Sequence, residues 1–268
     1  MKVFDEGKVM LLWSFTIWLV VMNTTMFNVA LPSVILDLGI RPEAGSWLVS
    51  GYSIGFAVST LIYSRLSDFL PISRLLFTGI VILGIGSLIG IFFENYWVLL
   101  CARVIQACGA GAVPGLAMVL AGRYIPLSRR GKNMAMIAAA ASMAFGLGPV
   151  IGGLITQYFG WNYLFAVPSL TLLFVPIFLK LLPAEEYRPG RFDWLGALVT
   201  IFVVVGVLMS ISTFSVFILA GIAILCLVLW RHLHNIESPF IHPGLLANKQ
   251  YLKLIYMAFT VFFLHFST

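Results

Sequence analysis

The chain has 268 residues, of which 61% are hydrophobic and only 10% are charged, and its formal net charge is +6 at pH 7. Soluble domains carry about 25% charged residues, so this composition excludes a soluble globular protein and indicates an integral membrane protein. The basic residues lie in short clusters between apolar runs and not on one face or arm, which argues against nucleic-acid binding.

The apolar runs have the length that crosses a bilayer, about 20 residues each. All of them should be helices, because loops and sheet edges would leave backbone groups without partners in lipid. We therefore expect an all-α polytopic membrane protein with eight complete spans and a ninth that is cut short. The expected spans are 9–35, 46–63, 75–93, 97–120, 135–155, 163–179, 194–211, 214–230 and 252–268.

Positive charge alternates from one connector to the next. The connectors on one side hold every Lys and Arg except Arg41, on the other side, and Arg103, within the fourth span. Because cytoplasmic connectors are enriched in Lys and Arg, the N-terminus should be cytoplasmic. We expect a multi-pass protein of the cell membrane, most simply a bacterial plasma membrane.

The polar connectors divide the chain into three parts. We expect a six-helix bundle over residues 1–180, a linker and two-helix hairpin over 181–240, and the start of a second bundle over 241–268. This pattern suggests that the chain is part of a longer protein. We expect its partners to be the lipid bilayer and the missing C-terminal half.

The first two spans carry candidate pathway residues. Thr24, Asn28 and Pro32 follow an i, i+4, i+8 line, which gives one polar face in an apolar helix. This face either joins helices or lines a cavity. Tyr52 and Phe56 in the second span are i, i+4 neighbours, a spacing that fits packing or a pocket.

Arg103 lies roughly two turns into the fourth span, where a central arginine costs about 2.5–3.5 kcal/mol on insertion scales. Gln106 shares its helix face at i+3. Arg103 could extend to the outer interface as an anchor, or it could be an interior cation lining a polar cavity. Gln106 favours the interior position, because lipid tails could not use the hydrogen-bonding groups of its amide.

The Asp and Glu residues all lie in connectors or at their edges. A membrane hydrolase, a metal transporter or a proton pump would normally need a carboxylate inside a span. Cys101, Cys108 and Cys226 lie in apolar runs without metal-ligand spacing, so we expect packing roles for them and no metal site. The glycines do not form a phosphate-binding loop, and we expect no cofactor and no enzyme activity.

Residues 143–154 read "MAFGLGPVIGGL". Gly148 and Gly152 form a G-x-x-x-G step with Gly153 beside it, which lets helix backbones approach closely in lipid. Pro149 removes a backbone donor and should bend the helix. The fifth helix therefore looks built to pack tightly and bend.

Several motifs occur in an order that resembles the major facilitator superfamily, more narrowly its fourteen-helix drug:proton antiporters. They are "NVALP" at 28–32, "SRLSDFLPISR" at 64–74, "RVIQACGAGA" at 103–112, "GLGPVIGG" at 146–153 and "FDWLG" at 192–196. The resemblance implies a first six-helix half, two linking helices and a partial ninth helix that opens the second half. It also implies proton-coupled efflux of hydrophobic or cationic drug-like molecules.

The resemblance further implies roles for particular residues. Arg103, Gln106, Asn23, Thr24, Asn28, Tyr52 and Phe145 would line the substrate and proton pathway. Asp68 and Arg74 would latch the cytoplasmic face. Gly146, Gly148, Pro149, Gly152 and Gly153 form the antiporter motif, whose Gly148, Pro149 and Gly152 would seal the interface between halves.

Some residues depart from the family pattern. Asn23 stands where many relatives carry Asp, and Phe145 stands where tetracycline exporters carry a glutamate. Both replacements remove a group that could titrate. They put tetracycline specificity in question, and proton coupling through this half with it.

The leading hypothesis is an efflux antiporter whose present portion should not transport alone, since alternating access needs two bundles. The alternatives are an exporter of a metabolite or amino acid, and a truncated membrane scaffold that does not transport. His265 in the ninth span could titrate near neutral pH or could be merely exposed at the chain end.

Overall fold

The computed structural model describes residues 5–188, 190, 192–213, 216–236, 239–241, 244 and 248–267, and the side chains of all of these except 208, 209, 211–213, 216–218, 258, 259 and 261–267. Over these residues the protein is helical and has no strand, as the sequence predicts. It divides into two compact units, Met1–Pro189 and Gly190–Thr268.

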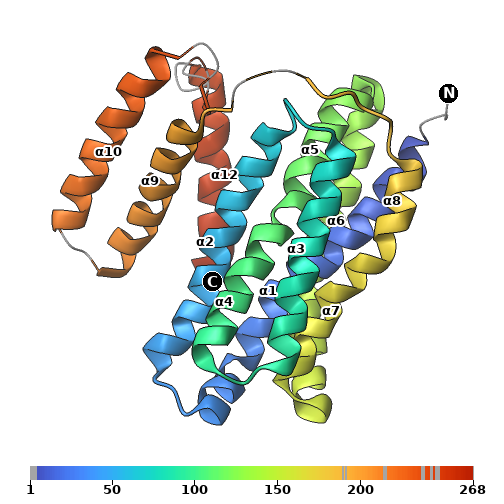
Figure 1. Cartoon of the computed structure of the whole chain (residues 1–268), viewed down its shortest axis with the longest axis vertical. Coiled ribbons are helices and arrows are strands. Elements are labelled where there is room, and N and C mark those ends of the chain that lie inside the picture. The colour runs from blue at the N-terminus through green and yellow to red at the C-terminus, as the bar shows by residue number, and fades with distance from the viewer. Residues whose placement is uncertain are drawn as a thin grey trace. The chain divides into compact units, whose positions relative to one another are not determined.

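The first unit is a bundle of long apolar helices (Figure 1). Its elements are α1 (Glu6–Leu38), α2 (Pro42–Leu66), α3 (Ile72–Phe92), α4 (Tyr96–Ala110), α5 (Ala112–Tyr124), α6 (Leu127–Phe159), η1 (Trp161–Phe165), α7 (Ala166–Ser169), η2 (Leu170–Phe174) and α8 (Val175–Leu181). Six stretches of these helices are long and apolar enough to cross a membrane. The expected first six spans are therefore confirmed.

Two spans differ in detail from the sequence expectation. The fourth is split into α4 and α5 with Gly111 between them. The sixth is a series of short 3₁₀ and α segments instead of one α-helix. Pro168 and Pro176 lie in that span, and each lacks the N–H that a regular α-helix needs at an interior position.

Side chains and glycines define the helix ends. Asp5 caps α1 by accepting a hydrogen bond from the backbone N–H of Lys8, and Asn95 caps α4 through Trp97 and Val98. Gly39 ends α1 with φ +59°, a left-handed conformation that glycine adopts without steric cost.

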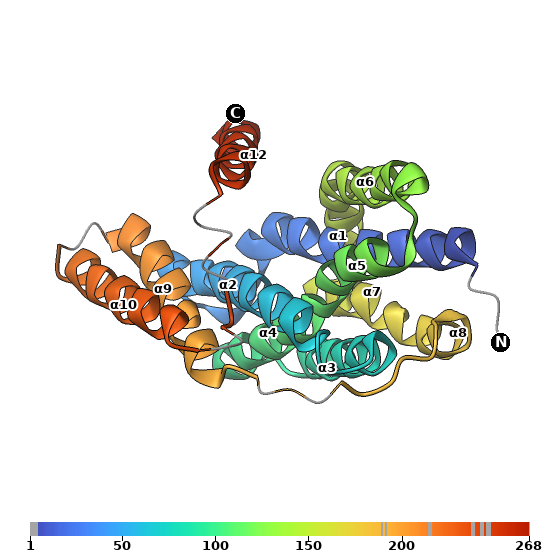
Figure 2. The same ribbon diagram turned by 90° about the horizontal axis from the view of Figure 1, so that it is seen from above.

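The bundle core lies where α1 packs along α6, and where α3 and α2 pack along α4. Figure 2 shows α6 lying over α1. Trp13 anchors α1 to α5 because its indole N–H donates to the Val113 carbonyl at 2.7 Å. Near the other end of α1, Asp37 accepts a hydrogen bond from Trp161 Nε1 at 2.9 Å.

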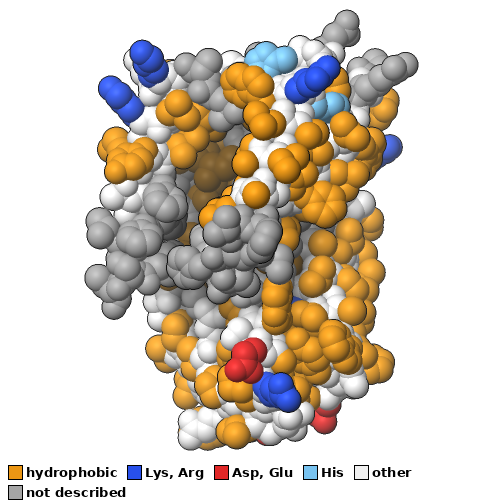
Figure 3. Space-filling view, turned by 90° about the vertical axis from the view of Figure 1, so that its left-hand side faces the viewer, with side chains coloured by type: hydrophobic (Ala, Val, Ile, Leu, Met, Phe, Trp, Pro, Cys, Tyr) orange, Lys and Arg blue, Asp and Glu red, His pale blue; other side chains and the backbone are white. Residues whose placement is uncertain are grey.

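Large apolar side chains also cover the outside of the helices. Leu11, Leu36 and Leu127 are 64–81% exposed. Among the residues that are coloured in Figure 3, hydrophobic side chains are the most widespread. A soluble monomer rarely exposes so much contiguous apolar surface. This surface suits contact with lipid tails.

The basic residues of the bundle gather at one end. Helix alternation brings the start of α1, the end of α2 and the end of α8 to this end (Figure 1). The cations placed there are Lys8, Arg65, Arg74, Arg123, Arg129, Arg130, Lys132, Lys180 and Arg188. Arg41 precedes α2 at the opposite end, so the charge asymmetry predicted along the chain is a feature of the folded bundle.

The second unit contains α9 (Trp194–Thr213), α10 (Val216–His234) and α12 (Lys249–Ser267). Helices α9 and α10 pack against each other, and Gly206 lets Ile222 approach the α9 backbone closely. The His265 side chain lies outside the described residues, as does part of the segment 241–268 expected to open a second bundle.

Candidate transport site

Arg103 of α4 lies in the interior of the first unit. Its side chain is fully buried, and its guanidinium carbon lies 4.1 Å from the ring centroid of Phe27 in α1 and 4.0 Å from that of Tyr52 in α2. Two aromatic faces at this distance attract a cation through their quadrupoles. This position fits the expected interior cation and not a side chain that reaches the lipid interface.

Hydrogen bonds join the guanidinium to residues of α1, α2 and α4. Arg103 Nη1 donates to Gln106 Oε1 at 2.8 Å and to Asn23 Oδ1 at 3.5 Å, and Nε donates to the Leu48 carbonyl at 3.4 Å. Asn23 Nδ2 also donates to Gln106 Oε1 at 3.1 Å, and Gln106 Nε2 donates to Ser87 Oγ of α3 at 2.9 Å. Residues of α1, α2, α3 and α4 therefore share one buried polar network.

Two polar atoms of this network are left without protein partners. Arg103 Nη2 and the Tyr52 hydroxyl are buried, and neither makes a hydrogen bond to the described residues. No ion pair to Arg103 occurs within the part of the chain that the structure describes. The site thus combines a buried positive charge with two buried polar atoms that make no hydrogen bond to the described residues.

The other candidate pathway residues of α1 point in different directions. Asn23 is buried in the network, Thr24 beside it is half-buried, and Asn28 is exposed on the bundle surface together with Pro32. Successive helix residues are turned by about 100°, so one helix carries both an inward and an outward polar face. Asn28 contributes a polar group to the surface of an otherwise apolar helix, whereas the Thr24 side chain lies beside the buried Tyr52 hydroxyl.

Tyr52 and Phe145 are the aromatic candidates for the pathway. Tyr52 stacks on Phe56, with ring centroids 6.1 Å apart and an angle of 11° between the ring planes. Tyr52 therefore has both a packing role and a place at Arg103. Phe145 of α6 is half-buried, one residue after the buried Ala144.

The glycines of α6 divide between two faces. A Cβ on Gly148 would lie 1.9 Å from Thr25 Oγ1, and a Cβ on Gly152 would lie 2.7 Å from the Met26 Cα. These two glycines therefore let α6 and α1 touch, as the G-x-x-x-G spacing predicts. A Cβ on Gly146 would meet nothing within 4 Å, and one on Gly153 would barely reach Val29. The helix continues through Pro149 without interruption.

Asp68, at the turn between α2 and α3, is the centre of a charged cluster at the basic end. It pairs with Arg65 at 2.5 Å and with Arg123 of α5 at 2.9 Å. Arg74, the other expected latch residue, is exposed and makes no ion pair with the described residues. Asp68 therefore pairs with Arg65 and Arg123, and not with Arg74, the other residue that was expected to form the cytoplasmic latch.

Glu185 completes this cluster, although the sequence alone does not single it out. Its carboxylate accepts hydrogen bonds from the backbone N–H of Ile72 at 2.5 Å and from the Tyr124 hydroxyl at 2.5 Å, and lies 3.8 Å from Arg123. Ile72 starts α3, whose preceding Pro71 offers no side-chain cap, so Glu185 supplies that acceptor from 113 residues away. It thereby fixes the segment after α8 to the bundle.

A family model described as Major Facilitator Superfamily matches residues 13–268. The chain belongs to the major facilitator superfamily. The family and the all-helical fold are those of membrane transporters and not of enzymes.

Three relatives show how far the similarity extends. The chain is 28% identical over 188 residues to the uncharacterized MFS-type transporter Rv1250 of Mycobacterium tuberculosis, covering 69% of this chain and 32% of that protein. It is 28% identical over 203 residues to the MFS-type transporter ppz2 of Metarhizium majus, covering 73% and 35%. It is 26% identical over 235 residues to the uncharacterized MFS-type transporter YcnB of Bacillus subtilis, covering 82% and 49%.

A solved structure has the same fold. The human organic anion transporter MFSD10 (TETRAN) superposes with a TM-score of 0.56 at 20% identity, covering 74% of this chain and 55% of that one. The chain thus spans about a third to a half of the curated relatives it matches.

The second unit of this major facilitator protein has its own buried carboxylate. Asp193 accepts hydrogen bonds from the backbone N–H groups of Gly196 at 2.8 Å and Phe240 at 3.0 Å, and contacts His232 Nε2 at 2.8 Å. Burial pushes the pKa of Asp193 upward, but the bonds from His232 and the two backbone groups outweigh it and hold that pKa below its ordinary value. Asp193 belongs to the "FDWLG" motif, whose function in this hairpin is to join the start of α9 to the end of α10.

Proposed function

We propose that the protein acts as a major facilitator efflux transporter that moves hydrophobic or cationic drug-like molecules out of the cell in exchange for protons. The chain spans only part of its relatives, so the proposal concerns the whole transporter. The order of the five motifs, which resembles that of drug:proton antiporters, supports the substrate class. The buried network around Arg103 supports a polar pathway.

The observation that carries the proposal is the Arg103–Gln106–Asn23 network. A buried arginine with hydrogen-bonding groups from four helices is costly in a membrane protein and marks functional sites in such proteins. In this account Asn23, Thr24, Asn28 and Tyr52 continue the polar path, and Phe145 borders it from α6. Substrate would pass along the face of the bundle that Thr24 and Asn28 make polar.

Alternating access supplies the mechanism. Two six-helix bundles rock about a central site, so the site opens to one side of the membrane at a time. The basic end of the first unit would face the cytoplasm, as the positive-inside rule predicts. There, Asp68 with Arg123 and Glu185 would hold the cytoplasmic ends of the helices in register, with Arg74 on the exposed surface.

The antiporter motif has a packing role in this mechanism. Gly148 and Gly152 hold α6 against α1, which keeps the first bundle rigid. Gly146 lies on a different, exposed face of α6 and would be available to the second bundle, with Pro149 and Gly153 between the two faces. The face of α6 that carries Gly146 would then seal the interface between the halves, while the face that carries Gly148 and Gly152 packs on α1.

Proton coupling needs titratable groups. The described helices of the first unit have no Asp or Glu residue in their interior. Glu6 and Glu43 lie in the first turn of a helix, Asp37 lies in the last turn of α1, and the other acids of this unit lie in connectors. Arg103 keeps its charge at physiological pH. Proton coupling in this account therefore depends on groups of the second half, with Arg103 acting as a fixed charge.

The proposal is tested in cells that express the full-length protein. Efflux predicts a lower steady-state level of a fluorescent lipophilic cation such as ethidium than in cells with empty vector, and a protonophore should abolish the difference. Equal levels, together with export of radiolabelled amino acids or metabolites, would replace drug efflux by solute export. Absence of both activities would support a scaffold that does not transport.

A further inference from the structure

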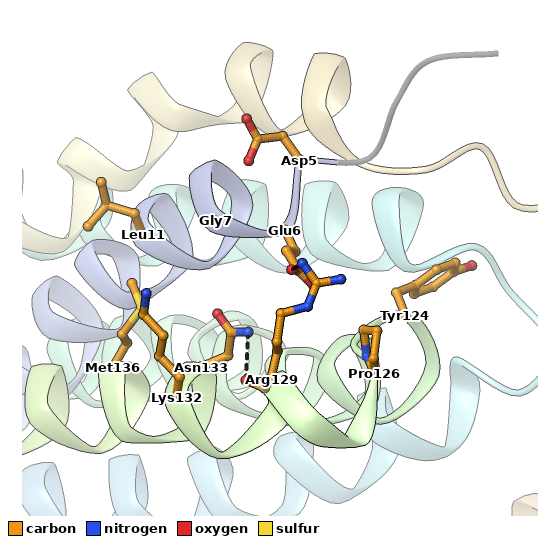
Figure 4. Close-up of a pocket in the computed structure, with 10 residues that line it drawn as sticks. All are labelled: Asp5, Glu6, Gly7, Leu11, Tyr124, Pro126, Arg129, Lys132, Asn133 and Met136. Atoms are coloured by element: carbon orange, nitrogen blue, oxygen red, sulfur yellow. Dashed lines mark hydrogen bonds and ion pairs between the residues drawn. The ribbon is translucent and has the colours of Figure 1, made fainter.

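A cavity of about 770 Å³ lies between the first turns of α1 and the start of α6, beside the end of α5 (Figure 4). It lies at the basic end of the bundle, away from Arg103. None of the roles proposed for the transport site uses it.

One wall of the cavity carries cations. Arg129 and Lys132 extend from the first turns of α6 toward α1 (Figure 4). Arg129 forms an ion pair with Glu6 of α1. The Lys132 ammonium is exposed and forms no ion pair with the described residues, so its charge is available to a ligand.

The same cavity also offers acceptors. Asn133 is only 5% exposed and lines the cavity, and its Nδ2 donates to the Arg129 carbonyl one turn back at 3.1 Å. Its side-chain oxygen accepts no hydrogen bond from the described residues, and Figure 4 shows it turned toward the space below α1. The Glu6 carboxylate, with a side chain 18% exposed, is the second acceptor. An amide oxygen that lines the cavity and has no donor among the described residues can accept a hydrogen bond from a ligand N–H.

The cavity changes character along the helix axes. Leu11 lies more than one turn beyond Glu6 on α1 and is 64% exposed, and Met136 lies one turn beyond Lys132 on α6. Charged groups therefore lie toward the helix ends, and apolar groups lie toward the membrane interior. This is the polarity gradient of a lipid at the bilayer surface.

We propose that the cavity binds a phospholipid whose headgroup carries a primary ammonium beside its phosphate. The phosphate contacts Lys132 and Arg129, the ammonium donates to Asn133 and Glu6, and the upper part of an acyl chain lies on Leu11 and Met136. Basic pockets between transmembrane helices bind anionic headgroups, but the acceptors here disfavour a purely anionic one. The proposal depends on membrane insertion and not on the transported substrate, so it stands or falls separately from drug efflux.

The test is native mass spectrometry of the full-length protein in detergent, with added phosphatidylethanolamine, phosphatidylglycerol or phosphatidylcholine of identical chains. We expect phosphatidylethanolamine to be retained most strongly. Lys132→Gln should weaken its apparent affinity about two- to fivefold, as for the loss of one exposed charge contact, and Lys132→Arg should restore it. Glu6→Gln should reduce the preference for phosphatidylethanolamine over phosphatidylglycerol.

Lys180→Gln is the matched control, because Lys180 is an exposed cation at the same end of the bundle and outside the cavity. Its lipid binding should equal that of the wild type. Equal retention of the three lipids, a preference for phosphatidylglycerol, or no effect of Lys132→Gln would overturn the proposal. So would competition by soluble phosphoethanolamine as strong as that of the lipid, since this would indicate a site for water-soluble zwitterions.

Discussion

Arg103 is held in the bundle by aromatic faces and neutral hydrogen-bond acceptors, without a carboxylate partner among the described residues. A cation–π contact contributes up to about 2 kcal/mol when it is shielded from water. Two such contacts and the bond to Gln106 can offset the insertion cost of about 2.5–3.5 kcal/mol. The planar guanidinium is essential to this arrangement, because it stacks and donates at the same time.

Arg103→Lys should therefore reduce transport by the full-length protein at least about tenfold, since an ammonium cannot stack between Phe27 and Tyr52 while bonding to both Gln106 and Leu48. The measurement is the initial efflux rate divided by the amount of protein in the membrane. Arg41→Lys, at an exposed arginine, is the control and should leave the rate unchanged. A rate for Arg103→Lys close to that of the wild type would show that charge alone suffices.

Asp193 should make the stability of the folded second unit depend on pH. A carboxyl group whose pKa is lowered by folding stabilises the folded state above its ordinary pKa, and this contribution disappears as pH falls through the lowered value. The ordinary value is 3.8, so the contribution should be complete above about pH 5 and should decrease below that.

Asp193→Asn tests this linkage. The variant should melt earlier than the wild type at pH 7, and the difference should shrink as pH falls from 5 to 3. Tryptophan fluorescence reports the transition, because Trp194 and Trp230 lie in α9 and α10. Glu43→Gln, an exposed acid of the first unit, should show no such trend. A difference that is constant over this pH range would rule out the ionised carboxylate as its source.

At the scale of elements, the contact between α1 and α6 depends on missing side chains. Gly152 lies against the backbone of Met26, which cannot rotate away, whereas Gly148 lies against the Thr25 side chain. Thr25 also donates to the Ala144 carbonyl at 3.2 Å, so hydrogen bonding reinforces the close approach. In lipid, such packing replaces the hydrophobic effect as the source of helix association.

Gly152→Ala should consequently destabilise the bundle by about 1–3 kcal/mol, the usual cost of overpacking. Thermal unfolding in detergent, followed by helical circular dichroism, measures the change. Gly146→Ala is the matched control on the same helix, and it should be neutral or slightly stabilising because its Cβ meets nothing within 4 Å. Equal melting temperatures for the two variants would contradict tight packing at Gly152.

At the scale of the whole molecule, the sequence predicts most of the first unit because lipid selects for length and hydropathy. Spans, helix type and charge asymmetry all follow from that selection, and the fifth-span glycines identify a close contact. The i, i+3 spacing of Arg103 and Gln106 likewise predicts their shared face. Local patterns are sufficient for such features.

Features that join distant segments could not be predicted in this way. Glu185 reaches Ile72 across 113 positions, and His232 reaches Asp193 across 39. In the sequence these acids and histidines lie in polar connectors, which is their usual place, so the sequence does not indicate their partners. The irregular sixth span was also missed, although Pro168 and Pro176 signal it.

The proposed function is substrate export driven by proton entry. Proteoliposomes containing the full-length protein, loaded with acidic buffer, test it through uptake of a fluorescent lipophilic cation after transfer to neutral buffer. Accumulation of the cation should depend on the imposed pH gradient and should collapse when nigericin dissipates it. Flux of the same size with and without the gradient would contradict proton-coupled exchange.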